Sequence, residues 1–324
     1  MRFKQLITTL PQFGELIQEK QNNKLTHAYM FVSSDQMLLQ EFSLMFASLV
    51  MCSSSTPCGE CVPCKKIELG SHPDVIILPQ EDKVYVSDVE KLIDESVLVA
   101  MEGDKKVYIF NNFSTANQQA QNKLLKTLET PPNNVFIILN VTNETAILPT
   151  ISSRCKKIRL NTLPCEKIEQ AIAPLCQQGV APRTISFISE GSLTRAFNFA
   201  SNDSFMQNYN LVCDVISNLK NSTTVLPLSH QLNEKKAYFA DILEIFESLF
   251  RDILMIRLNR KNLVTNQNIL STLEQLAQEY SADAVDLIIK RIYQTKEQVN
   301  FNVNPTTLID SLLLYILEAK HLCK

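Results

Sequence analysis

The sequence predicts an α/β domain with a parallel sheet, followed by a small helical module and an all-α C-terminal domain. Two patterns support this fold class. Up to about residue 160, short apolar runs alternate with amphipathic stretches, as expected for a parallel sheet whose strands are connected by helices. After that residue, apolar side chains recur only at helical spacing. A chain of 324 residues is long enough for two or three separate cores.

The sheet is expected to form from five short, mostly apolar segments that alternate with helices. Segment 106–110, for example, reads KVYIF and shows no alternation of apolar and polar residues. Continuous apolar character is typical of a strand that is covered by helices on both faces. The five expected strands span residues 27–32, 74–78, 106–110, 135–139 and 157–160.

The stretches between these strands predict amphipathic helices. Ser87, with Glu90 three residues later, forms a capping-box pattern at the start of one of them. Pro131 and Pro132 end another, because proline lacks an amide hydrogen and disfavours the helical conformation of the residue before it. The four expected helices span residues 4–22, 37–51, 86–99 and 116–128.

The C-terminal half is expected to be entirely helical. Residues 164–200 contain short helical patterns that are broken at Pro182 and Gly191. Residues 237–258 carry apolar side chains at helical spacing, and the rest of the C-terminal sequence follows the same pattern. The expected domains therefore span residues 1–161, 162–204 and 205–324.

Composition excludes several classes of function. The formal net charge is -3, so the chain does not hold nucleic acid through an overall positive charge. It contains only 6 glycines, which makes glycine-rich phosphate-binding loops scarce. No apolar run reaches the roughly 20 residues needed to span a bilayer, and the N-terminus lacks the apolar core of a signal peptide. We therefore expect a cytoplasmic protein that is not attached to a membrane.

The clearest candidate for a bound cofactor is a group of four cysteines. Cys52, Cys58, Cys61 and Cys64 have the spacing C-x5-C-x2-C-x2-C within the module 52–64. Zn²⁺ prefers four thiolates in a closed structural site, and C-x2-C turns present two of them to one ion. The spacing predicts structural zinc, and it leaves open an iron–sulfur cluster, a redox dithiol or four unrelated thiols.

The other five cysteines are scattered along the chain. In a reducing compartment, isolated cysteines are expected to act as small buried apolar residues. They are Cys155, Cys165, Cys176, Cys213 and Cys323.

Several longer phrases occur in a fixed order together with the cysteines. They read HAYMF at 27–31, SHPD at 71–74, NKLLKTLETPP at 122–132 and LPTISSRC at 148–155. In these phrases the chain resembles the clamp-loader branch of the AAA+ superfamily. The resemblance implies an AAA+-like N-terminal domain, a helical lid module after it, and a C-terminal collar through which loader subunits associate.

The chain departs from this family where its ATP-binding members carry a phosphate-binding loop. Ser33, Gln36 and Leu38 occupy the glycine positions, Leu39 occupies the lysine position and Gln40 the hydroxyl position. Side chains therefore fill the path along which a phosphate approaches the backbone, and the lysine charge is missing.

The acidic pair that follows the third strand in active members is also missing. This chain has Asn111 and Asn112, and two neutral amides bind magnesium poorly and cannot act as a base. Together with the altered loop, these residues predict that the chain neither binds nor hydrolyses ATP.

One catalytic residue of the family is retained. The resemblance implies that Arg154, in the sequence Ser153-Arg154-Cys155, reaches the γ-phosphate held by a neighbouring subunit as an arginine finger in trans. The alternative is a surface arginine paired with a carboxylate. Arg195 matches a nucleotide sensor of the lid module and would be structural without a nucleotide.

The resemblance therefore implies a non-ATP-binding subunit of the bacterial sliding-clamp loader, which supports ATP-driven loading of the clamp on primed DNA. Its partners would be the gamma/tau and delta subunits and, through the complex, the clamp and DNA. The chain would belong to the DNA polymerase III holoenzyme, a nucleotidyltransferase, without being catalytic alone. The alternatives are an ATP-hydrolysing subunit of the gamma/tau type and a zinc-binding scaffold on a degenerate ATPase fold.

Overall fold

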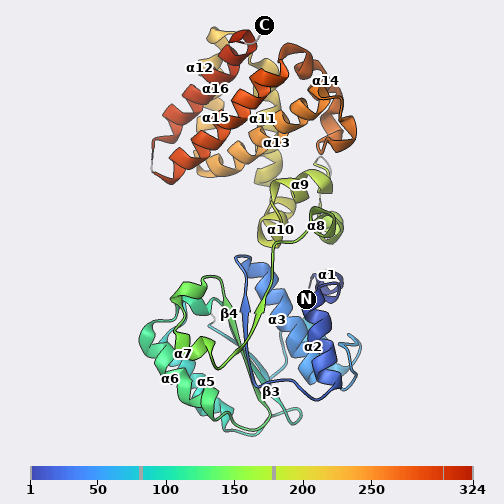
Figure 1. Ribbon diagram of the computed structural model, residues 1–324, viewed down its shortest axis with the longest axis vertical. Coiled ribbons are helices and arrows are strands. Elements are labelled where there is room, and N and C mark those ends of the chain that lie inside the picture. The colour runs from blue at the N-terminus through green and yellow to red at the C-terminus, as the bar shows by residue number, and fades with distance from the viewer. Residues whose placement is uncertain (1, 80–82, 177–179, 302, 323–324) are drawn as a thin grey trace. The chain divides into compact units, whose positions relative to one another are not determined.

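The computed structural model describes residues 2–79, 83–176, 180–301 and 303–322 (Figure 1). The chain divides into two compact units, Met1–Leu163 and Pro164–Lys324. The first is the predicted α/β domain and the second is helical. The boundary expected between residues 204 and 205 falls inside the second unit and remains a prediction. No helix in the described ranges is both long and apolar enough to cross a membrane.

The N-terminal unit is built on one sheet of five strands. Its strand order is β2-β3-β4-β1-β5, and every neighbouring pair is parallel. The prediction of five parallel strands is therefore confirmed. The strands are β1 (Ala28–Val32), β2 (Val75–Leu78), β3 (Lys106–Phe110), β4 (Val135–Val141) and β5 (Lys156–Arg159).

Helices cover both faces of this sheet (Figure 1). One face lies against α2 and α3, and the other against α5, α6 and α7. The helices of this unit are α1 (Lys4–Thr8), α2 (Pro11–Gln21), α3 (Gln36–Met51), α4 (Val62–Glu68), α5 (Val86–Ser96), α6 (Gln118–Glu129) and α7 (Pro149–Ser152).

Alternate residues of β1 pack into the apolar layers on the two faces of the sheet. Phe31 points to the α3 side, where its ring lies 4.9 Å from that of Phe42 in an edge-on arrangement. Met30 belongs to the opposite cluster, which includes Phe110 and Leu124. Since successive side chains of a strand point to opposite faces, burial on both faces explains the unbroken apolar runs of the sequence.

A helix break and a helix cap differ from the sequence prediction. The helix expected over residues 4–22 is two helices, and Pro11 occupies the first turn of α2, where its missing amide hydrogen has no cost. The Ser87 cap is also wrong. Helix α5 begins at Val86, as predicted, but its N-cap is Tyr85, whose amide hydrogen the Asp88 carboxylate accepts at 2.7 Å. Glu90 instead forms an ion pair with Lys123.

The second unit contains only helices in its described residues, as predicted. Pro182 starts a helix rather than breaking one, and Gly191 takes a positive φ of 83° in the turn before the next helix. The main helices are α8 (Cys165–Ile172), α9 (Pro182–Ile188), α10 (Leu193–Ser201), α11 (Asp203–Asn218), α12 (Ser222–Asn233), α13 (Phe239–Arg257), α14 (Leu270–Glu279), α15 (Ala282–Asn300) and α16 (Pro305–Leu322).

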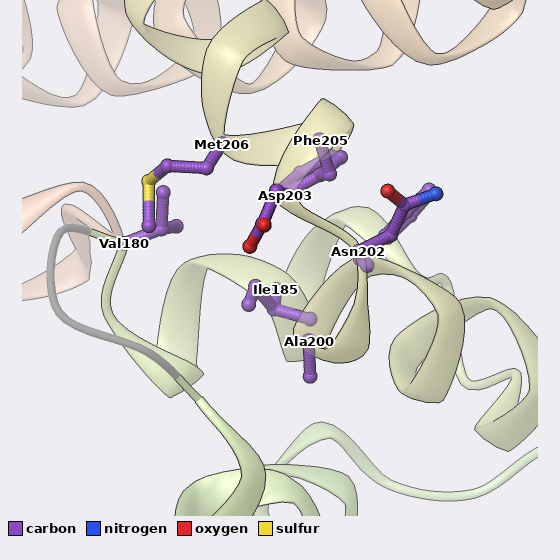
Figure 2. Close-up of a pocket in the computed structure, with 8 residues that line it drawn as sticks. Val180, Ile185, Ala200, Asn202, Asp203, Phe205 and Met206 are labelled. Carbon is purple, nitrogen blue, oxygen red and sulfur yellow. The ribbon is translucent and has the colours of Figure 1, made fainter.

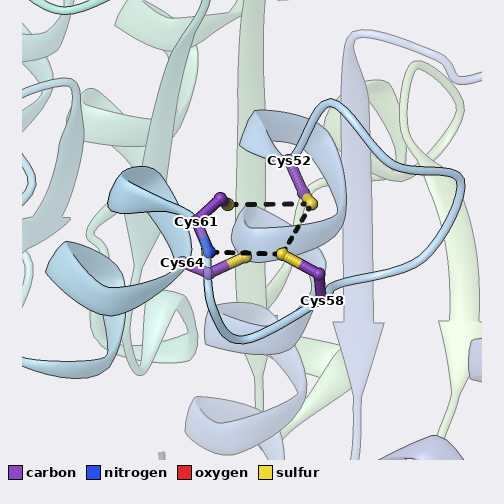
Figure 3. Close-up of side chains that lie close together, drawn as sticks. All are labelled: Cys52, Cys58, Cys61 and Cys64. Atoms are coloured by element: carbon purple, nitrogen blue, oxygen red, sulfur yellow. Dashed lines mark hydrogen bonds between the residues drawn. The ribbon is translucent and has the colours of Figure 1, made fainter.

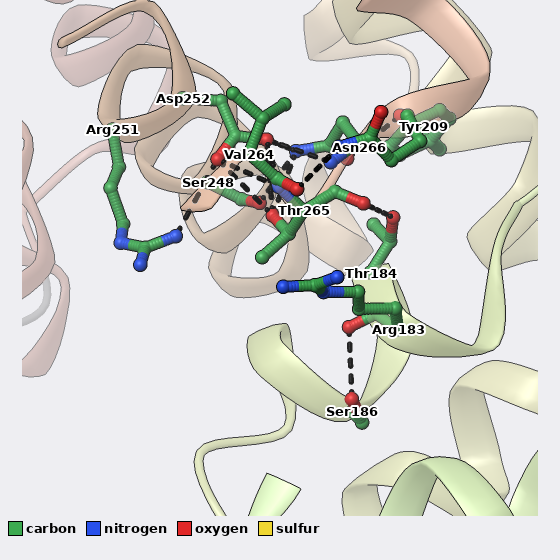
Figure 4. A network of polar contacts seen from close by, with 11 residues as sticks. Arg183, Thr184, Ser186, Tyr209, Ser248, Arg251, Asp252, Val264, Thr265 and Asn266 are labelled. Atoms are coloured by element: carbon green, nitrogen blue, oxygen red, sulfur yellow. Dashed lines mark hydrogen bonds and ion pairs between the residues drawn. The ribbon is translucent and has the colours of Figure 1, made fainter. Parts of the chain in front are cut away.

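A buried polar network joins the short helices of this unit to the long ones (Figure 4). The Asp252 carboxylate on α13 is fully buried and accepts the backbone amides of Thr265 and Asn266 at 2.9 and 2.7 Å. The Thr184 hydroxyl on α9 donates to the Thr265 carbonyl at 3.3 Å. A buried carboxylate needs such donors, so the network fixes α9 to α13.

Candidate functional site

The four clustered cysteines come together at the C-terminal end of α3. Cys52 directly follows α3, whereas Cys58, Cys61 and Cys64 belong to the turn before α4 and to its first residues. Their four Sγ atoms all lie within 4.8 Å of one another (Figure 3). The Cys52 Sγ lies 3.7 Å from that of Cys58 and 3.9 Å from that of Cys61.

These distances fit a tetrahedral metal site. Zn–S bonds of about 2.3 Å place neighbouring sulfurs about 3.8 Å apart. Gly59 supports the turn with a positive φ of 78°, which side-chain-bearing residues rarely adopt. The donor set and its spacing therefore suit a closed four-thiolate site that leaves no position for a substrate.

The thiols of this cluster differ in their pKa values. Hydrogen bonds from the Cys61 amide, at 3.3 Å, and from the Glu60 amide lower the pKa of the exposed Cys58 thiol to about 6. Burial raises the pKa of the Cys64 thiol to about 12. Because a bound cation favours thiolates, metal binding would release the Cys64 proton as the site fills.

The remaining cysteines lie away from this cluster. Cys155 is buried, in agreement with its expected role as a small apolar residue, and burial raises the pKa of its thiol to about 12. Three more are half-buried, and Cys323 lies outside the described residues. The half-buried ones are Cys165, Cys176 and Cys213.

The loop between β1 and α3 occupies the place of a phosphate-binding loop. It consists of residues 33–35. The Asp35 carboxylate accepts the amide hydrogen of Leu38 at 2.9 Å and so caps the N-terminus of α3. Asp35 is only 6% exposed. A negative group of the chain itself therefore lies at the helix terminus where an anion would otherwise bind.

The residue at the lysine position cannot serve this loop. Leu39 and Leu38 are each 1% exposed and belong to the core. A lysine at either position would place its stem in the apolar core instead of at a phosphate. Both leucines therefore contribute to the apolar core at the start of α3.

The paired asparagines that follow β3 form part of a polar network between strands. Asn140 on β4 is buried and donates from Nδ2 to the Asn111 side-chain oxygen at 3.0 Å. Its own Oδ1 accepts the Ser43 hydroxyl of α3 at 2.6 Å. These amides and this hydroxyl satisfy one another, whereas a magnesium site would present carboxylates. The sequence analysis did not identify Ser43 or Asn140.

Asn112 takes a left-handed conformation with a φ of 51°, which asparagine tolerates better than most residues. Its side-chain oxygen accepts the Thr142 hydroxyl at 3.3 Å. The turn therefore has a structural use for each of the two asparagines.

Comparison with protein families gives two matches along the chain. A family model described as "DNA polymerase III, delta subunit" matches residues 11–164, and one described as "DNA polymerase III, delta subunit, C terminal" matches residues 203–318. Together they cover most of both structural units. The chain belongs to the clamp-loader subunit family of DNA polymerase III.

Individual members of the clamp-loader subunit family agree with this assignment. DNA polymerase III subunit delta' of Bacillus subtilis is 24% identical over 308 residues, which cover 92% of this chain and 93% of that protein. Subunit delta' of Yersinia pestis is 27% identical and covers 75% of this chain and 73% of its own length. Subunit tau/gamma of Haemophilus influenzae is 29% identical over 61% of this chain, but the match spans only 30% of that longer protein.

Within this clamp-loader subunit, Arg154 lies just after the short helix α7. Its guanidinium donates to the Thr150 carbonyl at 2.8 Å and forms an ion pair with Glu129, the last residue of α6. The side chains of Arg154 and Glu129 are 34% and 49% exposed. The arginine is therefore held at the surface by a carboxylate, the arrangement that the alternative interpretation predicts.

The basic residues that follow Arg154 are also paired. Lys156 forms an ion pair with Glu19, and both Lys157 and Arg159 pair with Glu144. Hydrogen bonds from Lys157 and Arg159 lower the pKa of the Glu144 carboxyl group. This strand end is therefore close to neutral, which argues against an isolated basic patch for nucleic-acid phosphates.

Arg195, which the resemblance matched to a nucleotide sensor, is engaged by two carboxylates. Its guanidinium lies 3.0 Å from Glu190 and 3.3 Å from Glu244. It borders an open groove of about 480 Å³ that also contains Asp241. Acidic side chains on this groove disfavour a phosphate ligand, which agrees with a structural role for Arg195.

A neighbouring cavity in the same unit is too small for a nucleotide (Figure 2). Its volume is about 10 Å³, enough for at most one water molecule. Apolar side chains such as Val180, Ile185 and Met206 line it together with Asp203. It is a packing gap between α9, α10 and the start of α11.

Residues 71–74, with the sequence SHPD, hold the loop that precedes β3 through hydrogen bonds. Asp74 is 1% exposed, and its two carboxylate oxygens accept the amide hydrogens of Met101 and Glu102, each at 2.7 Å. The His72 Nδ1 accepts the Asp74 amide hydrogen at 3.2 Å. His27 contacts the Leu128 carbonyl through Nε2 at 2.9 Å. Both histidines therefore have structural roles, each through a hydrogen bond to the backbone.

Proposed function

We propose that this chain is a non-ATP-binding, delta-prime-type subunit of the sliding-clamp loader and supplies an arginine finger to a neighbouring ATPase subunit. The observation that carries the proposal is the capped loop at residues 33–35. The Asp35 carboxylate already satisfies the N-terminus of α3, so a nucleotide phosphate would meet a negative group in place of open backbone amides.

The ATP-hydrolysing gamma/tau type is the main alternative. Asn111 and Asn112 argue against it, because neither side chain carries the charge that magnesium and an attacking water require. Titration of the isolated chain with a fluorescent ATP analogue separates the two. Saturable, magnesium-dependent binding at micromolar concentration would identify the gamma/tau type instead.

Arg154 is suited to act on a neighbour. An exposed ion pair contributes only about 0–1 kcal/mol, so the pairing with Glu129 is easily exchanged for a more highly charged phosphate. The planar guanidinium contacts phosphate oxygens in two places. The partners implied are the gamma/tau and delta subunits, with the sliding clamp and primed DNA bound through the complex.

The arginine is tested by Arg154→Ala in a reconstituted loader with clamp and primed DNA. Fingers contribute on the order of 10³-fold at the affected site, and hydrolysis at the site that borders this chain should fall accordingly while assembly is normal. Turnover of the whole complex falls less, because other subunits keep their own arginines. Arg154→Lys should recover little, since an ammonium lacks the planar fork.

Arg159→Ala is the matched control, because Arg159 is also an ion-paired arginine of the same domain and its side chain is 63% exposed. It should leave ATP turnover unchanged. Glu129→Gln removes the carboxylate partner of Arg154 and should also retain turnover. If Arg154→Ala matches these controls at normal assembly, Arg154 has no part in the mechanism.

The four-cysteine module at 52–64 holds one structural Zn²⁺ in this proposal. Sulfur spacing close to that of a tetrahedral zinc site supports zinc. Metal analysis of protein purified without added metal should give about one zinc per chain. Iron with visible charge-transfer absorption would identify a cluster instead, and a metal-free protein would exclude both.

The C-terminal helices form the collar that assembles the loader. Exposed apolar side chains on α12 and α16, such as Leu226 at 73% and Leu314 at 44%, are available to other subunits. Deletion of residues 205–324 should leave the α/β unit folded, because that unit has its own core, and should abolish association with gamma/tau and delta subunits. Co-elution of the truncated chain with them at micromolar concentration would refute the collar assignment.

A zinc-binding scaffold of another pathway remains the third candidate. It predicts that the full-length chain does not assemble with loader subunits at all. Co-purification therefore distinguishes it from both loader types, independently of any measurement on ATP or metal.

A further inference from the structure

Lys20 is a residue of the cysteine site that the sequence spacing does not indicate. It lies near the end of α2, far from the four cysteines in sequence. Its ammonium group donates to the carbonyl oxygens of Leu49 at 2.6 Å, Cys52 at 2.6 Å and Ser54 at 2.5 Å. An ammonium has three hydrogens, so these three contacts use all of them.

The three carbonyls belong to the end of α3 and to the chain that leaves it. Helix α3 ends at Met51 and Cys52 is its C-terminal cap. The last carbonyls of a helix have no partners within it and carry its negative partial charge, so a cation stabilises them. Lys105 donates to another of these carbonyls, that of Val50, at 3.3 Å.

Cys52 depends on this contact more than the other three cysteines do. Cys58, Cys61 and Cys64 lie within one turn and the helix after it, so their mutual positions are set locally. Cys52 lies on a separate element and reaches the others only if the backbone leaves α3 in one direction. By bonding the carbonyls of Cys52 and Ser54, Lys20 fixes that direction.

The positive charge of Lys20 is a second way in which this residue can affect the metal site. Four thiolates around one divalent cation carry a net charge of -2. The Lys20 ammonium contacts the backbone of one of these ligands, and the Lys4 ammonium lies over Gly59 in the turn between two others. Positive groups at these positions offset the negative charge of a loaded site in partly buried surroundings.

We propose that Lys20 is a positioning residue of the metal site, which holds the Cys52 backbone in place and offsets the charge of the loaded centre. This inference rests on the proposed metal site. It does not depend on the clamp-loader role. Groups that orient metal ligands typically change metal affinity by about 10–100-fold when they are removed.

The test compares zinc-loaded Lys20→Met, Lys20→Arg and Lys24→Met with the wild-type chain. Lys24 is an exposed lysine just beyond the same helix, so Lys24→Met removes an equal charge from the same region. Zinc transfer to a colorimetric chelator gives the relative affinity, and thermal unfolding with and without metal gives stability. Lys20→Met should weaken zinc binding about 10-fold or more. Lys24→Met should not, and Lys20→Arg should lie between them.

A purely structural lysine gives a different result. Lys20→Met would then lower the unfolding temperature equally in the metal-loaded and metal-free proteins, with unchanged zinc affinity, and the proposal would be wrong. Should the wild-type chain bind no zinc, the metal site and this inference fail together. Clamp-loader assembly would be unaffected by that outcome, because it is measured by co-purification.

Discussion

Two regions of the N-terminal unit lie at opposite ends of α3 and differ in what they keep. At the C-terminal end, four thiols converge within 4.8 Å in a geometry that a metal ion can fill. At the N-terminal end, the Asp35 carboxylate fills the place of a ligand. The comparison shows that one end of the helix carries potential ligand atoms close together, whereas the other end is capped by a side chain of the chain itself. At the C-terminal end of α3, four thiols face a common point. At its N-terminal end, the Asp35 carboxylate accepts a backbone amide hydrogen that would otherwise have no partner within the helix.

Removal of a thiolate is the largest expected perturbation of this comparison. Cys64→Ser should lower zinc affinity by several orders of magnitude, because a closed four-thiolate site loses a buried ligand. Hydrogen exchange should accelerate over residues 50–70 while the sheet stays protected. Metal analysis and exchange measured on the same sample test both parts.

Cys155→Ser is the control for this substitution, because that thiol is buried away from the cluster. It should leave the zinc content unchanged. If both variants kept a full complement of zinc, the cysteine cluster would not be the metal site, and the contrast between the ends of α3 would disappear.

A smaller effect is expected at the network of neutral polar groups formed by Ser43, Asn111 and Asn140. Asn140→Ala removes the partner of both Ser43 and Asn111 and leaves buried polar groups unpaired. The expected loss is about 1–3 kcal/mol in the free energy of unfolding, measured by urea denaturation. Thr130→Ala, at an exposed side chain, should change stability little. If Asn140→Ala lowered the free energy of unfolding no more than Thr130→Ala does, the network would not contribute to stability.

The smallest expected effect concerns the cap itself. Asp35→Ala should cost about 1 kcal/mol in stability, the usual contribution of an N-cap. It should not create ATP binding, because Leu39 remains in the core and the acidic pair is still absent. Urea denaturation and titration with a fluorescent ATP analogue measure the two parts. Tight binding by this single variant would show that Asp35 alone blocks the nucleotide.

The sequence predicted the sheet well because its signal is local. Apolar runs such as 106–110 define a strand buried on both faces without knowledge of its neighbours. The breaks and caps of the helices were less accurate. The break at Pro11 and the N-cap at Tyr85 depend on which of several adequate residues occupies the first turn, and the final packing decides that.

The candidate site was predictable only where its residues are close in sequence. The spacing of Cys58, Cys61 and Cys64 directly indicates a turn that can present several thiolates to one metal ion. Ser43 and Asn140 meet across 97 residues, and Lys20 and Cys52 across 32, so no local pattern indicates either contact. Such partners follow from the strand order and the packing of helices on the sheet, which only the folded structure provides.

The carboxylate at the N-terminus of α3 also makes this end of the helix independent of any added ligand. A protein that needs a free ligand at such a position gains stability with the logarithm of ligand concentration. Here the anion is tethered two bonds from the backbone, so its local concentration never changes. In the proposed function, the structure at the N-terminus of α3 would therefore not depend on the ATP concentration. It would stay the same while the neighbouring ATPase subunits bind and hydrolyse ATP.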